Sequence, residues 1–147
     1  MNKPDQAVEC FNAKFSCSQA VFSAYAPDFG MDKETALKVA GAFGGGIARL
    51  GDACGAVTGA LMAIGLKYGK TKAEDEAAKE KTYLFSQEFI EEFKSRNGTV
   101  ICRELTGCDM SSPEGLQKFK ESNMHQTRCV KLVRDAAEIL ERFYQEG

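Results

Sequence analysis

Cysteine is the residue type with which this chain could most readily do chemistry. Its 147 residues include six: Cys10, Cys17, Cys54, Cys102, Cys108 and Cys129. A thiolate is a nucleophile and a ligand for soft metals, and a buried thiol can also serve as a small apolar side chain. The chain has no C-x-x-C pair. Any disulfide must therefore join cysteines that folding brings together, with Cα atoms within about 7 Å.

Cys54 lies in the stretch "AFGGGIARLGDACGAVTGALMAIG", residues 42–65. We expect Asp52 to cap a helix that runs from Ala53 to about Tyr68, which places Cys54 in the first turn. The unpaired N–H groups of a first turn favour an anion and lower the pKa of a cysteine thiol there. Arg49 adds a positive charge nearby in the sequence. We therefore predict that Cys54 has the lowest thiol pKa of the six cysteines.

Cys17 repeats this arrangement because it directly follows Ser16, which we expect to cap the next helix. Gln19 stands three residues after Ser16, and the two form the pattern of a capping box. Free cysteines are often small buried hydrophobic residues, so both cysteines also have a structural interpretation. From the residues alone, the reactive and structural interpretations stay open.

The glycines around Cys54 fit close packing better than phosphate binding. A phosphate loop needs G-x-x-x-x-G-K-[ST] or G-x-G-x-x-G after a strand. Here "GGGIARLG" follows an expected helix, and no Lys-Ser or Lys-Thr closes it. Gly51, Gly55, Gly59 and Ala63 recur at steps of four, and such a stripe lets another helix backbone approach closely.

The rest of the chain shows helical spacing and no sustained strand-like alternation. The expected helices cover residues 4–13, the segment between Ser16 and Pro27, the segment from Asp32 to the glycines at 44–46, and residues 53–68, 73–96 and 126–145, with a further helix after Ser112-Pro113 and a short turn or two in "TVICRELTG". Aromatic residues at 85, 89 and 93 predict a core-facing stripe on the long helix. Cys129 shares one face of the last helix with Val133 and Leu140. The sequence predicts an all-α fold, a single-domain bundle of about seven or eight helices over residues 1–147.

Composition and charge exclude several classes of partner. The net charge is −2 and the chain has no basic block, so we expect no nucleic-acid binding. The longest uncharged run, Ala53 to Leu66, has 14 residues, whereas a membrane span needs roughly 20. The first residues lack the apolar segment of a secretory signal, so we expect a cytoplasmic protein. Six cysteines in such a protein favour redox or metal chemistry over a disulfide framework.

The chain resembles the family of redox-active proteins labelled C_GCAxxG_C_C, small bacterial and archaeal proteins with four signature cysteines. Cys54 in "CGAVTG" matches the central block, although the label writes Gly-Cys-Ala where this chain has Cys-Gly-Ala. Cys17 in "FSCSQAVFSAYA" matches the first signature cysteine, and Cys102 in "ICRELTG" and Cys129 in "TRCVKLVRDAAEIL" match the third and fourth. The resemblance covers nearly the whole chain and implies redox activity without naming a reaction. Cys10 and Cys108 have no place in the pattern.

Thiol–disulfide exchange with an unknown redox partner and no cofactor is the leading functional hypothesis. Cys54 is the expected attacking thiolate, and Cys17, Cys102 or Cys129 is the expected resolving partner. One alternative uses the same four thiols to hold zinc or an iron–sulfur cluster, although their spacing lacks the usual close pair. The second is a helical binding module with structural cysteines, in which the glycine stripe is the seam of a homodimer. We expect the lone His125 to be a surface residue rather than a ligand or proton carrier.

Overall fold

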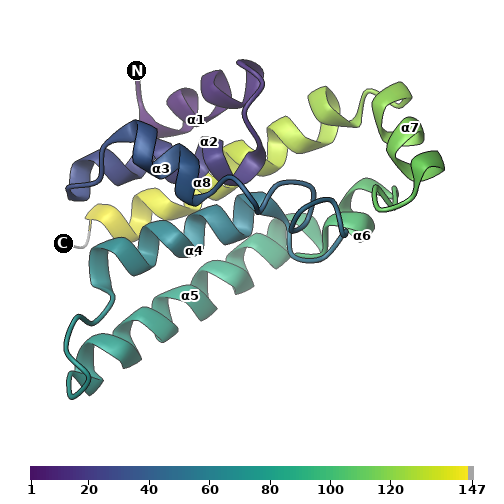
Figure 1. Cartoon of the computed structure of the whole chain (residues 1–147). Helices are drawn as coiled ribbons and strands as arrows, with labels where there is room; N and C mark the ends of the chain where they lie inside the picture. Colours follow the sequence, from purple (N-terminus) through teal and green to yellow (C-terminus); the bar gives the residue numbers. More distant parts are fainter. Residues whose placement is uncertain (146–147) are drawn as a thin grey trace.

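The computed structural model describes residues 1–145, and in this part of the chain it contains eight α-helices and no β-strand (Figure 1). The helices are α1 (Lys3–Asn12), α2 (Cys17–Tyr25), α3 (Lys33–Val39), α4 (Gly55–Tyr68), α5 (Glu76–Asn97), α6 (Cys102–Thr106), α7 (Pro113–Glu121) and α8 (Val130–Gln145). The prediction of an all-α bundle of about seven or eight helices is confirmed. None of the described helices has the length and apolar composition of a membrane span.

Local capping explains where several helices begin. Ser16 accepts a hydrogen bond from the Gln19 N–H, and the Gln19 side chain accepts one from the Ser16 N–H, so the expected capping box is formed. The Asp32 side chain accepts a backbone N–H at the start of α3, and the Ser112 side chain does so at the start of α7. Each such cap stabilises a helix by about 1 kcal/mol. These starts are therefore set by residues close to them in the sequence.

The expected start of α4 is wrong. The helix begins at Gly55, with Cys54 as its N-cap residue, and Asp52 does not cap it. Instead, Ala53 forms an isolated antiparallel bridge with Ile101. The backbone before α4 thus pairs with a distant segment of the chain and is drawn out of the helix.

The ends of two other predicted helices also differ. The helix α3 ends at Val39, well before the glycines at 44–46. The segment predicted as the start of the last helix forms a π-helical turn, His125–Cys129, before α8. The predicted buried face is confirmed, because Cys129, Val133 and Leu140 are all buried.

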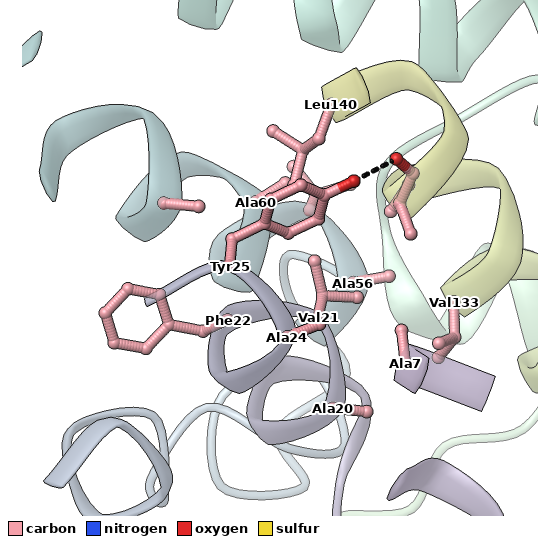
Figure 2. Packing of buried hydrophobic residues seen from close by; sticks show 14 of the residues in the cluster. Ala7, Ala20, Val21, Phe22, Ala24, Tyr25, Ala56, Ala60, Val133 and Leu140 are labelled. Atoms are coloured by element: carbon pink, nitrogen blue, oxygen red, sulfur yellow. Dashed lines mark hydrogen bonds between the residues drawn. The ribbon is translucent and has the colours of Figure 1, made fainter. Parts of the chain in front are cut away.

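Small residues let α1, α2 and α4 pack closely in the core (Figure 2). Ala7 of α1, Ala20 of α2 and Ala60 of α4 have no exposed surface. Tyr25 of α2 reaches α8, where its hydroxyl donates to the Ala137 carbonyl oxygen at 2.7 Å. This hydrogen bond ties the end of α2 to α8.

The helices α2 and α4 approach each other closely at two glycines. A Cβ atom at Gly59 would lie 2.6 Å from the carbonyl oxygen of Ser18, and one at Gly55 would lie 3.0 Å from the Ser18 nitrogen. Gly51 does not extend this stripe, because it lies outside α4 and has a φ of +76°. Since α2 of the same chain covers Gly55 and Gly59, these glycines do not form the seam of a homodimer.

The loop between α3 and α4 coils in a left-handed sense beside α6 (Figure 1). Residues 45–49 and Gly51 have φ values between 50° and 76°. Ile47 is β-branched, and such residues avoid this region because of the steric clash at Cβ. The N–H of Asp52 donates to the Gly46 carbonyl oxygen at 2.8 Å and holds the coil closed. A Cβ at Gly46 would lie 2.6 Å from Cβ of Cys102, so glycine lets the loop contact α6.

Replacing Gly59 with Ala should destabilise the protein by about 1–3 kcal/mol, because the added methyl group meets backbone atoms of α2. Gly65→Ala is the matched control on the same helix, since a Cβ there meets nothing within 4 Å. That control should be neutral or stabilise the protein by up to about 1 kcal/mol. Denaturant unfolding of both variants measures the difference. Equal stability of the two variants would show that α2 and α4 are not in close contact.

Candidate functional site

Three of the four signature cysteines lie at helix starts. Cys17 is the first residue of α2, Cys54 is the N-cap residue of α4, and Cys102 is the first residue of α6. The expected position of Cys17 is confirmed. The position of Cys102 was not predicted, because α6 is too short to give a helical pattern in the sequence. The fourth, Cys129, ends the π-helical turn before α8.

Backbone contacts bring these helix starts together. A Cβ at Gly55 would lie 3.2 Å from Cβ of Cys17, so the starts of α2 and α4 touch. The Cys54 N–H donates to the Val100 carbonyl oxygen, and the Cys102 N–H donates to the Asp52 carbonyl oxygen, both at 2.7 Å. These two hydrogen bonds hold the start of α6 against the start of α4.

The four signature cysteines form one cluster. The pKa of Cys17 is raised by its hydrogen bond to Cys129, by burial, and by the charges of Cys54, Cys129 and Cys102 when these are ionised. Burial raises the pKa of Cys102 to about 12, and charges on Cys54, Cys129 and Cys108 act in the same direction. Effects of this kind require short separations between the thiols. The fold therefore gathers the four residues that the sequence analysis selected.

The two remaining cysteines differ in their relation to this cluster. Cys108 is buried next to it, with its N–H donating to Oγ1 of Thr106 at 3.2 Å. Cys10 lies apart, in the contact between α1 and α2, where its sulfur is 3.8 Å from Oγ of Ser23. Cys10 therefore has the surroundings of a structural residue.

The thiol of Cys54 does not have the lowest pKa, contrary to the prediction. Burial raises its pKa to about 11, although the backbone N–H groups of Ala56 and Val57 and the charge of Arg128 act in the opposite direction. The helix start thus has the expected sign but a smaller effect than desolvation. Cys54 is a protonated thiol at neutral pH.

Cys129 is the cysteine of the cluster whose pKa is lowered. The Cys17 thiol hydrogen-bonds to the Cys129 sulfur and favours its thiolate, burial opposes this, and the charge of Arg128 assists it. The same hydrogen bond raises the pKa of Cys17. The pair therefore holds one proton on Cys17 more readily than on Cys129. This is the arrangement of a nucleophilic thiolate beside a protonated partner.

Arg128 is a component of the site that the sequence analysis missed. Its Nε donates to the Leu105 carbonyl oxygen at 3.2 Å, and its Nη2 donates to the Asn97 carbonyl oxygen at 3.4 Å. No carboxylate among residues 1–145 forms an ion pair with it. The guanidinium charge therefore acts on the thiols instead. Its position directly before Cys129 was the only signal in the sequence.

A pocket of about 770 Å³ opens onto part of the cluster. Cys17 and Cys129 line it, whereas Cys54 and Cys102 do not. Cys17 is also the one partly exposed cysteine among the six. A reagent in the pocket therefore meets the Cys17–Cys129 pair first.

Two residues that the sequence analysis assigned elsewhere also line this pocket. His125 is half-buried and stacks on Phe11 with ring centroids 4.1 Å apart, so it is not a plain surface residue. Burial lowers the pKa of His125. Arg49 lies on the left-handed loop and lines the pocket with Cys17, while Arg128 is the cation that acts on Cys54.

The comparison with protein families agrees with this cluster. Residues 15–143 match the family described as "Putative redox-active protein (C_GCAxxG_C_C)". The chain belongs to this family. The matched residues contain all four cysteines of the cluster, and Cys10 lies outside them. No curated protein and no solved structure matches the chain.

The four cysteines of the cluster are the ligands that a zinc or iron–sulfur site would use. Within the described part of the chain, no three Cys, His, Asp or Glu side chains stand in the arrangement of a metal site.

Alkylation by a small neutral reagent should modify Cys129 at lower pH than Cys54. The lowered pKa of Cys129 gives it a larger thiolate fraction at any given pH, whereas a pKa of about 11 leaves Cys54 about one part in a thousand ionised at pH 8. Peptide mapping after short exposures between pH 6 and 10 measures both. Modification of Cys54 before Cys129 would reinstate Cys54 as the nucleophile.

Arg128→Gln should raise the pKa of Cys129, because it removes the positive charge that favours the thiolate. The alkylation midpoint of Cys129 should then move to higher pH. Arg134→Gln is the control, since Arg134 lies on α8 and pairs with Asp5 at 3.0 Å. An unchanged midpoint in Arg128→Gln, or an equal shift in the control, would argue against the role of Arg128.

Proposed function

We propose that the protein is a thiol–disulfide redox protein in which Cys17 and Cys129 alternate between a dithiol and a disulfide. One observation carries the proposal: Cys17 and Cys129 line the same open pocket, and each thiol shifts the pKa of the other. Membership of a redox-active family supports it.

The reaction begins at the sulfur of Cys129. Its thiolate attacks one sulfur of an oxidised partner's disulfide, so the partner's S–S bond breaks and a mixed disulfide forms on Cys129. The departing partner thiolate takes a proton from Cys17. The Cys17 thiolate then attacks the Cys129 sulfur and releases the second partner thiol, which is protonated from water. In sum, two electrons pass from the protein's dithiol to the partner's disulfide, and the reverse reaction reduces the protein.

Cys54 and Cys102 take no part in this first exchange. Both are buried and neither lines the pocket, and burial keeps both protonated at neutral pH. The role of attacking thiolate that the sequence suggested for Cys54 therefore passes to Cys129. The expected resolving group stays within the predicted set, because Cys17 belongs to it.

Mild oxidation with diamide should join Cys17 to Cys129, since the two thiols are neighbours in the lining of the pocket. Peptide mapping without reduction identifies the linked pair. The control variant Cys10→Ser should form the same Cys17–Cys129 disulfide as the unchanged protein, because Cys10 lies outside the cluster. Cys17→Ser should instead accumulate an adduct at Cys129 that the missing partner cannot resolve.

Three results would contradict this proposal. A disulfide between Cys54 and Cys102 would move the redox pair into the interior. Stoichiometric zinc or iron in the purified protein, lost in Cys54→Ser, would favour the metal alternative. Thiols that react only after denaturation would favour the helical binding module with structural cysteines.

A further inference from the structure

The pocket above Cys17 and Cys129 is lined by positive charge. Lys14, Arg49 and Lys120 line it, and no Asp or Glu does. The chain as a whole has a net charge of −2, so this concentration of cations runs against its composition. We call this site the cationic pocket.

The three cations are available to a ligand. All three are exposed, and none forms an ion pair among residues 1–145. Six of the other sixteen Lys and Arg residues form ion pairs in the described part of the chain, as Lys3 does with Asp28 at 3.0 Å and Arg134 with Asp5. The unpaired charges raise the local concentration of anions at the pocket entrance.

The remaining lining of the cationic pocket is largely apolar. Phe11 is 2% exposed and stacks on His125, while Phe15 and Phe119 line the pocket nearer the surface. Because burial lowers the pKa of His125, its ring is mainly neutral at pH 7 and offers an aromatic face and a hydrogen-bonding nitrogen. A volume of about 770 Å³ lies within the range of small-molecule sites, about 300–1,000 Å³.

We infer that the cationic pocket binds a small anionic disulfide, and the thiol formed from it, as the redox partner of Cys17 and Cys129. The inference rests on the proposed exchange at this pair and names its substrate class. The ligand's carboxylates pair with Lys14, Arg49 and Lys120 at the exposed side of the pocket. Its disulfide reaches the thiols at the buried side, where Cys129 is 6% exposed.

The exchange with such a ligand is balanced within the pocket. Cys129 sulfur attacks the near sulfur of the ligand disulfide, and the first ligand thiolate leaves with the proton from Cys17. Cys17 then displaces the second ligand thiolate from Cys129, and this thiolate takes a proton from water. One small disulfide is reduced to two thiols, and the protein gains one disulfide. The charge of the ligand halves does not change during the reaction, so the cations hold substrate and product alike.

Three disulfide probes of different charge test the inference. Glutathione disulfide is anionic at pH 7, bis(2-hydroxyethyl) disulfide is neutral, and cystamine is cationic. The reduced protein should form the Cys17–Cys129 disulfide fastest with the anionic probe and slowest with the cationic one. Added salt should reduce this difference because it screens exposed charges.

Charge variants then assign the preference to the pocket. The triple variant Lys14→Gln, Arg49→Gln and Lys120→Gln should lower the rate ratio of the anionic to the neutral probe by about tenfold or more. The matched control Lys72→Gln, Lys79→Gln and Lys94→Gln removes as many charges, but none of these residues lines the pocket. The control should keep the ratio of the unchanged protein.

Binding without reaction separates the ligand class from the redox chemistry. S-methylglutathione carries the same acidic groups but has no thiol to exchange, and it should bind to Cys17→Ser, Cys129→Ser protein in calorimetry. The pocket triple variant should abolish this binding. Equal rates with all three disulfides and no binding of S-methylglutathione would overturn the inference while leaving the proposed exchange intact. Binding without formation of the disulfide would instead overturn the proposed exchange and keep the pocket.

Discussion

The contact of α2 with the two glycines of α4 is the constraint on which the candidate site depends. Gly55 and Gly59 let the backbone of Ser18 approach to distances that any side chain would prevent. Because Cys17 and Cys54 stand at the adjoining ends of these two helices, the same contact sets their separation. Larger side chains at the two glycines would separate the thiols as well as the helices. The packing and reactive interpretations of the glycine-rich stretch are therefore not alternatives.

A second constraint comes from the way the chain enters α4. The left-handed coil of residues 45–49 requires conformations that cost about 1–3 kcal/mol at each non-glycine residue. The coil is held at Gly46 by the Asp52 N–H, and the next segment is held by the bridge between Ala53 and Ile101. This route brings α6 and Cys102 to the cluster, and it places Arg49 at the pocket. The strained conformation of this loop therefore helps to place both the thiol cluster and the positive charge of Arg49 at the pocket.

The accuracy of sequence-based prediction followed the range of the interactions involved. The caps at Ser16, Asp32 and Ser112 were predictable because each donor and acceptor lies within three residues. Asp52 has the same residue type as a good cap, but pairing of its neighbour with Ile101 prevents it from acting as one. That pairing joins residues almost fifty positions apart, and no local pattern records it.

The candidate site shows the same division. The four cysteines could be chosen from the sequence, by their number and their resemblance to a family pattern, and the fold brings them together. Their pKa values could not be predicted from the sequence, because a position at the start of a helix gives only the direction of one contribution to the pKa. At Cys54 burial exceeds that contribution, whereas at Cys129 the hydrogen bond from Cys17 exceeds burial. Both outcomes depend on contacts that exist only in the folded chain.

The cluster thus has two levels that differ in access and in proton affinity. The pair of Cys17 and Cys129 faces the pocket and shares a proton, while Cys54 and Cys102 stay buried and protonated behind it. Arg128 acts on both levels, because its charge favours the thiolates of Cys129 in the outer pair and of Cys54 in the inner pair. Once Cys17 and Cys129 form a disulfide, the hydrogen bond and the charge between them disappear. The charge of the Cys129 thiolate, which raises the pKa of Cys54, is then gone, so oxidation of the outer pair favours ionisation of Cys54.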